Sequence, residues 1–495
     1  MGIVSPAYIF FLIIFSLIFY YSNSKIKLFV LLFSSLIFYY LQSGELIVLF
    51  VIIVVINYYF SAKIIINQEN SQRKKYLIIG LVFNIAVLLF YKYFNAIGDL
   101  FYTSSANNGI NRFKIEQLPG ISFFTFVQIG YLVDLYRKGN ESGTKLTEYA
   151  SFITFFPSVL SGPIERSTTL LPQLKNNRGF NYELYVDGLK LIAWGIFKKT
   201  VIADRLAIYV NNVYSNPHGS KSLALIIATF FFSIQIYCDF SGYSHIAIGS
   251  AQLFGIKLTQ NFRQPYLSKS IKDFWNRWHI TLSNWIRDYI FLSLAYFFVR
   301  FANKVKITFV KKDYFSYISA VILSMALVGI WHGSKLTFLV WGVLHGIYLS
   351  VSLIGKKKRK KITKAFRLNK FPKLLTLLNV ITTFILVCFS WIFFKSNNLY
   401  DAVYVIRNLF SDIRLNKSYL MENLAGHGLT LQDIIISFVM IIFLFLIQYF
   451  QQKEHILSYI KYINKYFRWS LYLALTLAII FLGLFNNSEF IYYQF

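Results

Sequence analysis

Residues 316–352 decide the fold, and they read SYISAVILSMALVGIWHGSKLTFLVWGVLHGIYLSVS. The stretch is apolar and almost uncharged except for a polar cluster at its middle, Trp331 to Lys335. One crossing of a bilayer takes about twenty residues, so this stretch is too long for a single uninterrupted span. Gly333 and Ser334 predict a break in the helix, and irregular backbone at membrane depth normally lines a cavity.

Apolar blocks of the same kind recur along the whole chain. Hydrophobic residues make up 56% of the 495 residues and charged residues only 14%. Soluble chains show amphipathic patterns instead, because much of each element faces solvent. We therefore predict an all-α integral membrane protein, a single domain over residues 1–495, with roughly ten to twelve crossings. The blocks lie near residues 6–21, 27–42, 46–62, 76–95, 118–135, 185–210, 222–255, 284–300, 316–350, 374–394, 431–450 and 468–486.

The net charge is strongly positive, because Lys and Arg exceed Asp and Glu by 29. In a membrane protein such residues collect in cytoplasmic loops, so we expect no nucleic-acid partner. Lys25 and Lys27 follow the first block and residues 73–75 follow the third, which predicts an N-terminus outside the cell. The run Lys356 to Lys361 marks a basic cytoplasmic loop at about 355–373, as a topology signal or as a contact for membrane lipid.

Histidines are costly inside a bilayer unless they have a partner, a water-filled cavity or a function. His218, His427 and His455 lie in polar loops, where a solvated side chain is the simplest interpretation. His332 lies within the long apolar stretch, and the residue pattern alone fits catalysis and a structural hydrogen bond equally well. On an unbroken helix, His345 would lie on a different face from His332.

A second polar cluster runs from Asp273 to Asp288 and contains three tryptophans within eleven residues. On a helix, Asp273 and Arg277 would pair. His279 and Ser283 would then share one face of the same helix. The tryptophans are also typical of a helix that is anchored at the membrane interface.

A third feature is Asp239, a carboxylate inside the apolar block 222–255. It could hold a histidine or a cation, bind substrate hydroxyls or act as a buried structural acceptor. The two cysteines, Cys238 and Cys388, have no Cys or His at metal-ligand spacing. We therefore expect no disulfide framework and no zinc site.

These segments together resemble the membrane-bound O-acyltransferase family, in the bacterial branch that contains the alginate O-acetyltransferase membrane subunit. The resemblance covers nearly the whole chain and rests on an ordered set of motifs, of which no single tripeptide is specific. The motifs are Leu118–Phe126, Phe155–Pro157, Gly162–Ile164, Phe197–Lys199, Ile202–Arg205, Asp239–Ser244, Phe274–Asp288, Gly329–Gly333, Trp341–Gly346 and Phe490–Phe495.

The resemblance implies a bundle of transmembrane and re-entrant helices around a tunnel through the bilayer. It also implies that His332 is the principal catalytic residue and His279 a second functional histidine. That branch commonly has Asp where this chain has His245, which puts a close substrate match in that part of the tunnel in doubt. Five further side chains are candidates for contact with substrate or tunnel: Trp331, Trp278, Ser283, Asp239 and His345.

Acyl transfer from a thioester to a sugar hydroxyl needs a base, and neutral imidazole suits that role at about pH 7. We expect His332 to be this base or a transient acyl acceptor. His279 and Ser283 would orient the acyl group or stabilise the oxyanion. The expected donor is acetyl-CoA, with no permanently bound cofactor, and the expected acceptor is an extracytoplasmic glycan, either an exopolysaccharide or peptidoglycan.

Two alternatives stay open. One is D-alanyl transfer to teichoic acid from an acyl-carrier protein, and the other is a non-enzymatic transporter, although no inverted repeat is apparent. Because we find no hydrolase-like domain outside the membrane, we expect a separate serine-type acetyltransferase partner. The expected location is the bacterial cell (inner) membrane, with several passes through it.

Overall fold

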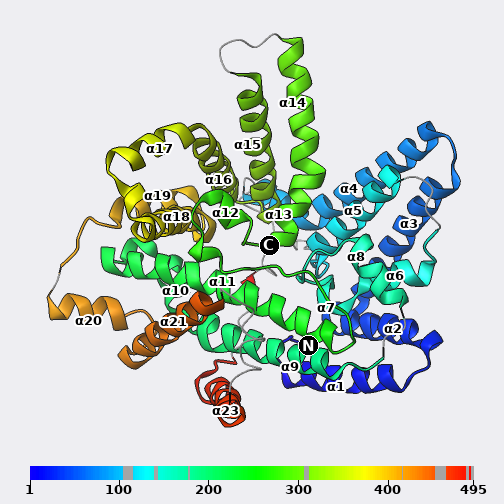
Figure 1. The fold of residues 1–495 in the computed structure, drawn as a ribbon, viewed down its shortest axis with the longest axis horizontal. Coiled ribbons are helices and arrows are strands. Elements are labelled where there is room, and N and C mark those ends of the chain that lie inside the picture. Colours follow the sequence, from blue (N-terminus) through cyan, green and yellow to red (C-terminus); the bar gives the residue numbers. More distant parts are fainter. Residues whose placement is uncertain are drawn as a thin grey trace. The chain divides into compact units, whose positions relative to one another are not determined.

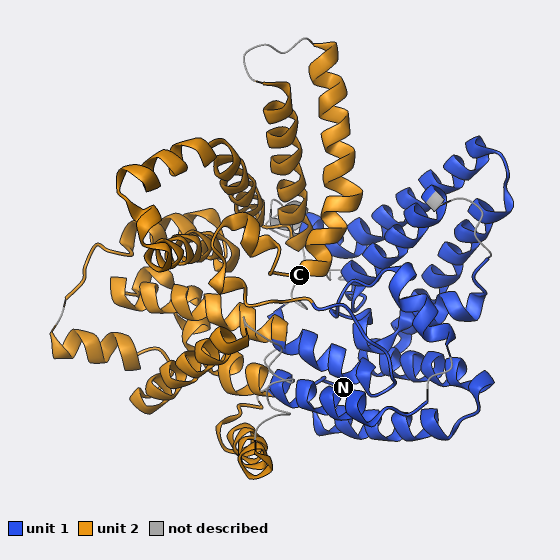
Figure 2. Ribbon diagram, in the orientation of Figure 1, with its two compact units in different colours: residues 1–196, 242–260, 489–495 blue, residues 197–241, 261–488 orange. Residues whose placement is uncertain are grey.

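The structure is a computed structural model that describes residues 1–103, 115–138, 143–176, 179–305, 311–414, 416–451, 464–485 and 490–491. Within these residues every regular element is a helix (Figure 1). The chain forms two compact units (Figure 2), the first from residues 1–196, 242–260 and 489–495 and the second from residues 197–241 and 261–488. The predicted all-α membrane architecture is confirmed, while the prediction of a single domain stays a prediction.

The first unit is built around helices that share buried amide groups. Asn57 donates hydrogen bonds to Asn84 and Gln128, and Asn84 donates back to Asn57, with donor–acceptor distances of 2.6–3.3 Å. Such bonds join apolar helices that have no hydrophobic drive to associate in lipid. The helices are α1 (Pro6–Tyr21), α2 (Ser24–Ser43), η1 (Gly44–Leu46), α3 (Ile47–Ile66), α4 (Asn70–Thr103), α5 (Ile121–Lys138), α6 (Leu146–Thr154), α7 (Phe156–Val159), α8 (Ser167–Lys175), α9 (Tyr182–Ile196) and the end of α11 (Ser222–Gln252).

The second unit carries the segments around His332 and His279. Its helices are η2 (Phe197–Ala203), α10 (Asp204–Ser215), η3 (Pro217–Gly219), the start of α11, η4 (Pro265–Leu267), α12 (Ile271–Trp275), α13 (Ile280–Ile286), η5 (Arg287–Phe291), α14 (Leu292–Lys304), α15 (Lys312–His332), α16 (Leu336–Ile354), α17 (Lys356–Ala365), η6 (Leu368–Lys370), α18 (Pro372–Lys395), α19 (Leu399–Asn408), α20 (Lys417–Ala425), α21 (Leu431–Gln451) and α23 (Lys465–Leu482). Two of the short elements, η2 and η5, are π-helices.

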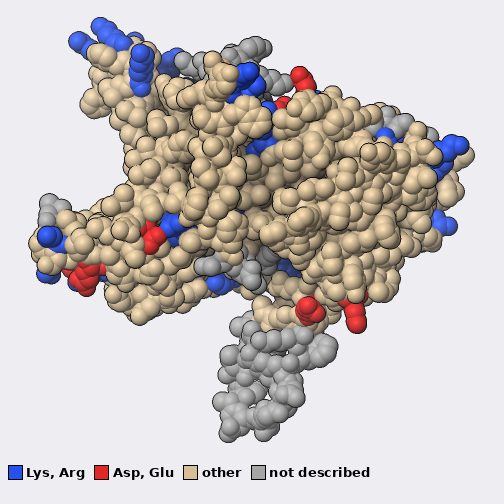
Figure 3. Space-filling view, turned by 90° about the horizontal axis from the view of Figure 1, so that it is seen from below, with Lys and Arg blue, Asp and Glu red and all other residues tan. Residues whose placement is uncertain are grey.

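Eight candidate membrane spans occur among the described residues, by length and composition. The first of them, Ser24–Ile66, joins two helices of 20 residues each, and α1 is a shorter apolar helix. The predicted ten to twelve crossings therefore stay a prediction. On the face drawn in Figure 3, most of the surface is uncharged, and Lys and Arg side chains stand in separate groups. Large exposed side chains such as Phe10, Val48 and Ile442 suit contact with lipid.

Helices α15 and α16 form a tight hairpin, and this confirms the predicted break in residues 316–352. α15 ends at His332 and α16 begins at Leu336. Glycines allow the close approach, because a Cβ on Gly329 would overlap the Phe338 carbonyl and one on Gly342 would overlap the Met325 carbonyl. Small residues at a helix contact let the two backbones pack closely in a membrane.

One predicted feature differs from the structure. Residues 273–288 do not form one helix, because α12 ends at Trp275 and α13 begins at Ile280. The predicted pair is nevertheless present, with Arg277 Nε 2.8 Å from Asp273 Oδ1. The basic segment at 355–373 contains α17, which has no buried residue, and its cytoplasmic location stays a prediction.

Candidate active site

His332 is the last residue of α15, and it is only 2% exposed. Three rings meet its imidazole edge-on, those of Trp331, Trp341 and Phe394, with centroids 4.7, 5.1 and 5.0 Å away. These contacts hold the ring in one orientation at the tip of the hairpin. The C-terminal end of a helix carries partial negative charge, so it stabilises the imidazolium that forms when His332 takes up a proton.

His345 lies one helix away from His332, and both of its ring nitrogens have partners. Trp275 Nε1 donates to His345 Nδ1 at 3.3 Å, and His345 Nε2 lies 2.9 Å from Ser390 Oγ. Ser390 Oγ donates to a backbone carbonyl, so Nε2 carries the proton and donates to the serine. The ring is thus neutral and joins α12, α16 and α18. This arrangement favours a positioning role, while its contact with a tunnel stays a prediction.

His279 occupies a strained turn just before α13. Its φ of 41° and ψ of 55° lie in the left-handed region, which a residue with a Cβ rarely adopts. Asn261 holds the turn, because its Oδ1 lies 3.1 Å from His279 Nδ1 and accepts from Thr281 Oγ1 at 2.9 Å. An amide oxygen only accepts, so His279 Nδ1 carries the proton. Strain of this kind persists where surrounding structure enforces it, as at ligand sites.

The aromatic side chains connect the segments of His279 and His332. Trp278 lies 5.2 Å from Trp391, which stacks on Trp341 at 5.7 Å with an interplanar angle of 16°. Trp341 in turn meets His332. His279 is the N-cap residue of α13, and the Ser283 amide donates to its carbonyl at 2.9 Å. The Ser283 hydroxyl donates to the Trp278 carbonyl at 3.2 Å, and its contact with substrate or tunnel stays a prediction.

Asp239 has a cationic partner, which was one of the alternatives for this carboxylate. Lys199 Nζ lies 2.7 Å from Asp239 Oδ1 and 2.8 Å from Asp204 Oδ1. Lys199 comes from the π-helix η2, a wider turn that is frequent at functional sites. Next to it, Lys198 Nζ donates to Ser241 Oγ at 3.1 Å. All five side chains are buried, so two cations are held inside the unit by polar partners.

Comparison with known families decides the identity of the fold. A family model described as MBOAT, membrane-bound O-acyltransferase family, matches residues 35–396. The chain belongs to the membrane-bound O-acyltransferase family. The matched range includes His279, His332 and His345, so the three histidines lie in the part of the chain that defines this O-acyltransferase family.

Curated relatives of this membrane-bound O-acyltransferase are named for acyl transfer to polymers. A probable alginate O-acetylase of Pseudomonas syringae is 31% identical over 388 residues, which cover 77% of this chain and 69% of that protein. A peptidoglycan O-acetyltransferase of Helicobacter pylori is 33% identical over 371 residues, covering 69% of this chain and 66% of that protein. A teichoic acid D-alanyltransferase of Bacillus subtilis is 30% identical over 284 residues, covering 56% of this chain and 68% of that protein. The chain is therefore an enzyme, an O-acyltransferase, which excludes the transporter alternative.

The sequence analysis did not name four residues that contact the candidate site residues, namely Lys199, Asn261, Trp341 and Trp391, as site residues themselves. Lys199 had a signal, because two adjacent lysines interrupt the apolar block 185–210. Asn261 had none, because its partner His279 is eighteen residues away across an irregular segment. Trp341 begins the motif Trp341–Gly346 and Trp391 belongs to an apolar block, but neither indicates a contact by its residue type. Their contacts with His332 and Trp278 follow only from the fold.

Among the described residues, no three His, Cys, Asp or Glu side chains gather as ligands of a metal ion would. Of two pockets found among the described residues, one is lined mainly by α2 and α8 and the other mainly by residues 117–123. Neither includes His332 or His279, so the tunnel stays a prediction. His455 and residues 492–495 of the last motif lie outside the described residues.

Proposed function

We propose that this O-acyltransferase moves an acetyl group from cytoplasmic acetyl-CoA across a bacterial cell membrane for O-acetylation of an extracytoplasmic polysaccharide. The observation that supports the proposal is the fraction of this chain that each group of relatives matches. The alginate and peptidoglycan enzymes match 77% and 69% of this chain, whereas the Bacillus D-alanyltransferase matches 56%. The longer matches favour acetyl as the group transferred.

His332 is the proposed base. Its imidazole takes the proton of the acceptor hydroxyl while the hydroxyl oxygen attacks the thioester carbonyl. When the C–S bond breaks, coenzyme A leaves as a thiolate and takes the proton back from the imidazolium. A two-step path is also open, in which a ring nitrogen attacks the thioester carbonyl, the C–S bond breaks and coenzyme A leaves as a thiolate that takes the ring proton. The acceptor hydroxyl then attacks the acetyl-imidazole, and its proton goes to the imidazole as the C–N bond breaks. Either path uses the imidazolium-stabilising end of α15.

His279 is the proposed second functional histidine. Its proton is fixed on Nδ1 by Asn261, so Nε2 is the nitrogen that can accept a hydrogen bond. The rigid turn would keep this nitrogen in place while the acyl group is positioned, which saves the cost of ordering it during reaction. The role as orienting group follows from this rigidity.

The charges at the ends of the α15–α16 hairpin support transfer across the membrane. Lys311 and Lys312 precede or begin α15, and Lys356 to Lys361 follow α16. Cationic residues prefer the cytoplasmic side, and α15 with 21 residues is long enough to cross. His332, at the other end of the hairpin, would then lie toward the extracytoplasmic side, whereas acetyl-CoA is cytoplasmic.

The first experiment tests His332 in cells. His332→Ala is expected to abolish polymer acetylation at unchanged protein abundance, measured by acetate release from wall and capsule fractions. His427→Ala is the matched control, because His427 lies in a loop outside the α15–α16 hairpin and should leave acetylation intact. Normal acetylation in the His332 variant, with the protein present, would refute the assignment.

The second experiment identifies the donor and the need for a partner. Purified enzyme in vesicles is given labelled acetyl-CoA in one arm and a D-alanyl-charged carrier protein in the other. Label in the first arm only is the expected result, and label from the carrier alone would make D-alanyl transfer the function. Complete transfer to an added polymer without any other protein would exclude the separate serine-type acetyltransferase that we propose as partner.

A further inference from the structure

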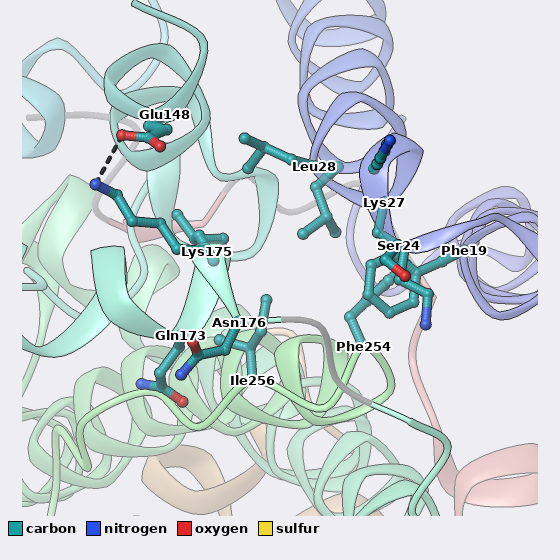
Figure 4. A pocket seen from close by; sticks show the side chains of 13 residues that line it. Phe19, Ser24, Lys27, Leu28, Glu148, Gln173, Lys175, Asn176, Phe254 and Ile256 are labelled. Carbon is teal, nitrogen blue, oxygen red and sulfur yellow. Dashed lines mark ion pairs between the residues drawn. The ribbon is translucent and has the colours of Figure 1, made fainter. Parts of the chain in front are cut away.

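A basic pocket lies within the first unit, and none of the residues proposed for catalysis lines it. It is about 210 Å³ in volume and is lined by the first turns of α2, the end of α8 and the segment that follows α11. Figure 4 shows Lys27 on one side, from α2, and Lys175 on the other, from α8. With about 30 Å³ for each water in the liquid, the space takes a group several times the size of a water molecule.

The charges of the lining are unbalanced in favour of cations. Lys25, Lys27 and Lys175 face a single carboxylate, Glu148. Glu148 is already engaged, because its Oε2 lies 2.7 Å from Lys175 Nζ and accepts from the Lys145 amide at 3.1 Å, which caps α6. The two lysines of α2 therefore add positive charge that this carboxylate does not offset. An anion in the pocket would be attracted to these cations.

The walls of the pocket are held in place before any ligand binds. Gln173 of α8 donates to the Lys257 carbonyl at 2.9 Å and accepts from the Lys257 amide at 3.0 Å. This pair of bonds ties α8 to the segment after α11. On the α2 side, Lys27 Nζ lies over the rings of Phe19 and Tyr20, 5.2 and 5.8 Å from their centroids. A preformed site loses less entropy on binding than a flexible one.

The lining of the pocket includes both polar and apolar side chains. Ser24, Gln173 and Asn176 offer polar groups beside the lysines, and Leu28, Leu31 and Ile256 offer apolar surface. A ligand that suits both parts carries a compact anionic head on an apolar or neutral tail. The N-terminal turn of α2 has a smaller effect in the same direction, because helix N-termini favour anions.

We propose that this pocket binds a phosphate ester at the cytoplasmic face of the membrane. Two sources present that chemistry there, the headgroup of an anionic phospholipid and the phosphates of coenzyme A. The predicted orientation puts Lys25 and Lys27 on the cytoplasmic side, where both sources are found. Binding of the lipid is independent of acyl transfer, whereas binding of coenzyme A would rest on the proposed function.

Binding to purified full-length protein in a neutral detergent tests the proposal. The probes are dihexanoyl phosphatidylglycerol, dihexanoyl phosphatidylcholine and coenzyme A, each titrated into wild type and into Lys25→Gln/Lys27→Gln. We expect at least one anionic probe to bind about tenfold more weakly to the double variant, because it loses two cations near the phosphate. The zwitterionic phosphatidylcholine should show little change.

The matched control is Lys357→Gln/Lys360→Gln, which removes the same charge from the exposed helix α17. It should keep wild-type affinity, since those lysines lie outside the pocket. A loss confined to phosphatidylglycerol identifies the lipid as source, and a loss confined to coenzyme A identifies the nucleotide. Equal affinity of wild type and the pocket variant for both anionic probes would overturn the proposal, as would an equal loss in the α17 control. If the double variant does not fold, Lys25→Glu replaces it, because Lys25 is exposed and has little packing to lose.

Discussion

The imidazole of His332 meets the indole of Trp341 edge-on, with ring centroids 5.1 Å apart and ring planes at 85°. The same indole stacks on Trp391 and lies 5.0 Å from the ring of His345. His345 is in turn fixed by Trp275 and Ser390. The orientation of the proposed base thus depends on one indole that is itself held from two sides.

We predict that Trp341→Ala lowers both stability and activity. Removing a buried indole leaves a cavity and should reduce the free energy of unfolding by about 3–5 kcal/mol. The rate of acetyl transfer should fall by about tenfold or more even well below the unfolding temperature, because a misplaced base is costly. Trp341→Phe keeps an aromatic edge and should retain more of both. Equal rates for wild type and Trp341→Ala, at matched amounts of folded enzyme, would show that the indole does not position His332.

The close packing of α15 on α16 leads to a second prediction. Gly329→Ala introduces a methyl group against the Phe338 carbonyl and forces the helices apart, at a cost of about 1–3 kcal/mol. Because His332 lies three residues further along α15, acetyl transfer should fall as well. Gly98→Ala in α4 is the matched control, since a Cβ there meets nothing within 4 Å. Thermal unfolding and the transfer rate are measured for both variants. An equal loss of stability and rate in Gly329→Ala and Gly98→Ala would show that the α15–α16 contact does not cause the effect.

Much of the fold could be predicted from composition, because lipid leaves few choices. The block 6–21 coincides with α1 (Pro6–Tyr21), and the break near Gly333 separates two helices as expected. Apolar runs of span length form helices wherever backbone groups need internal partners. The helix expected at 273–288 was wrong for a local reason, because Asn261 holds His279 in a left-handed turn that interrupts it.

The candidate site was predictable only in part. His332 and Asp239 were noticeable because an ionisable group in an apolar block needs an explanation. Their partners were not, since Trp341 and Phe394 carry no polar signal and reach His332 only through the packing of α16 and α18. Lys199 belongs to the motif Phe197–Lys199, yet its bonds to Asp204 and Asp239 depend on the wide turn of η2.

The buried charges around Lys199 lead to a third prediction. Asp239→Ala leaves Lys199 with one carboxylate fewer, and breaking a buried ion pair from one side costs about 3–5 kcal/mol. The triple variant Lys199→Met/Asp204→Leu/Asp239→Leu removes these three charges together and should be more stable than Asp239→Ala. Thermal unfolding in detergent measures both. If the triple variant unfolds at a lower temperature than Asp239→Ala, the three charged side chains stabilise the fold by more than the neutralisation of one another's buried charge.

The burial of His279, which lies outside the candidate spans, leads to a fourth prediction. Burial lowers the pKa of His279 from 6.5 to about 3. As the pH falls below 6.5, the unfolded chain protonates this ring while the folded chain keeps it neutral, so the folded state loses stability until the pH reaches about 3. His279→Gln removes the titrating ring, so its unfolding temperature should fall less than that of the wild type between about pH 8 and about pH 5. At about pH 8 the ring is neutral in both states, and that measurement gives each protein its own baseline. The same pH-dependent loss in both proteins would mean that His279 is protonated as readily in the folded chain as in the unfolded one.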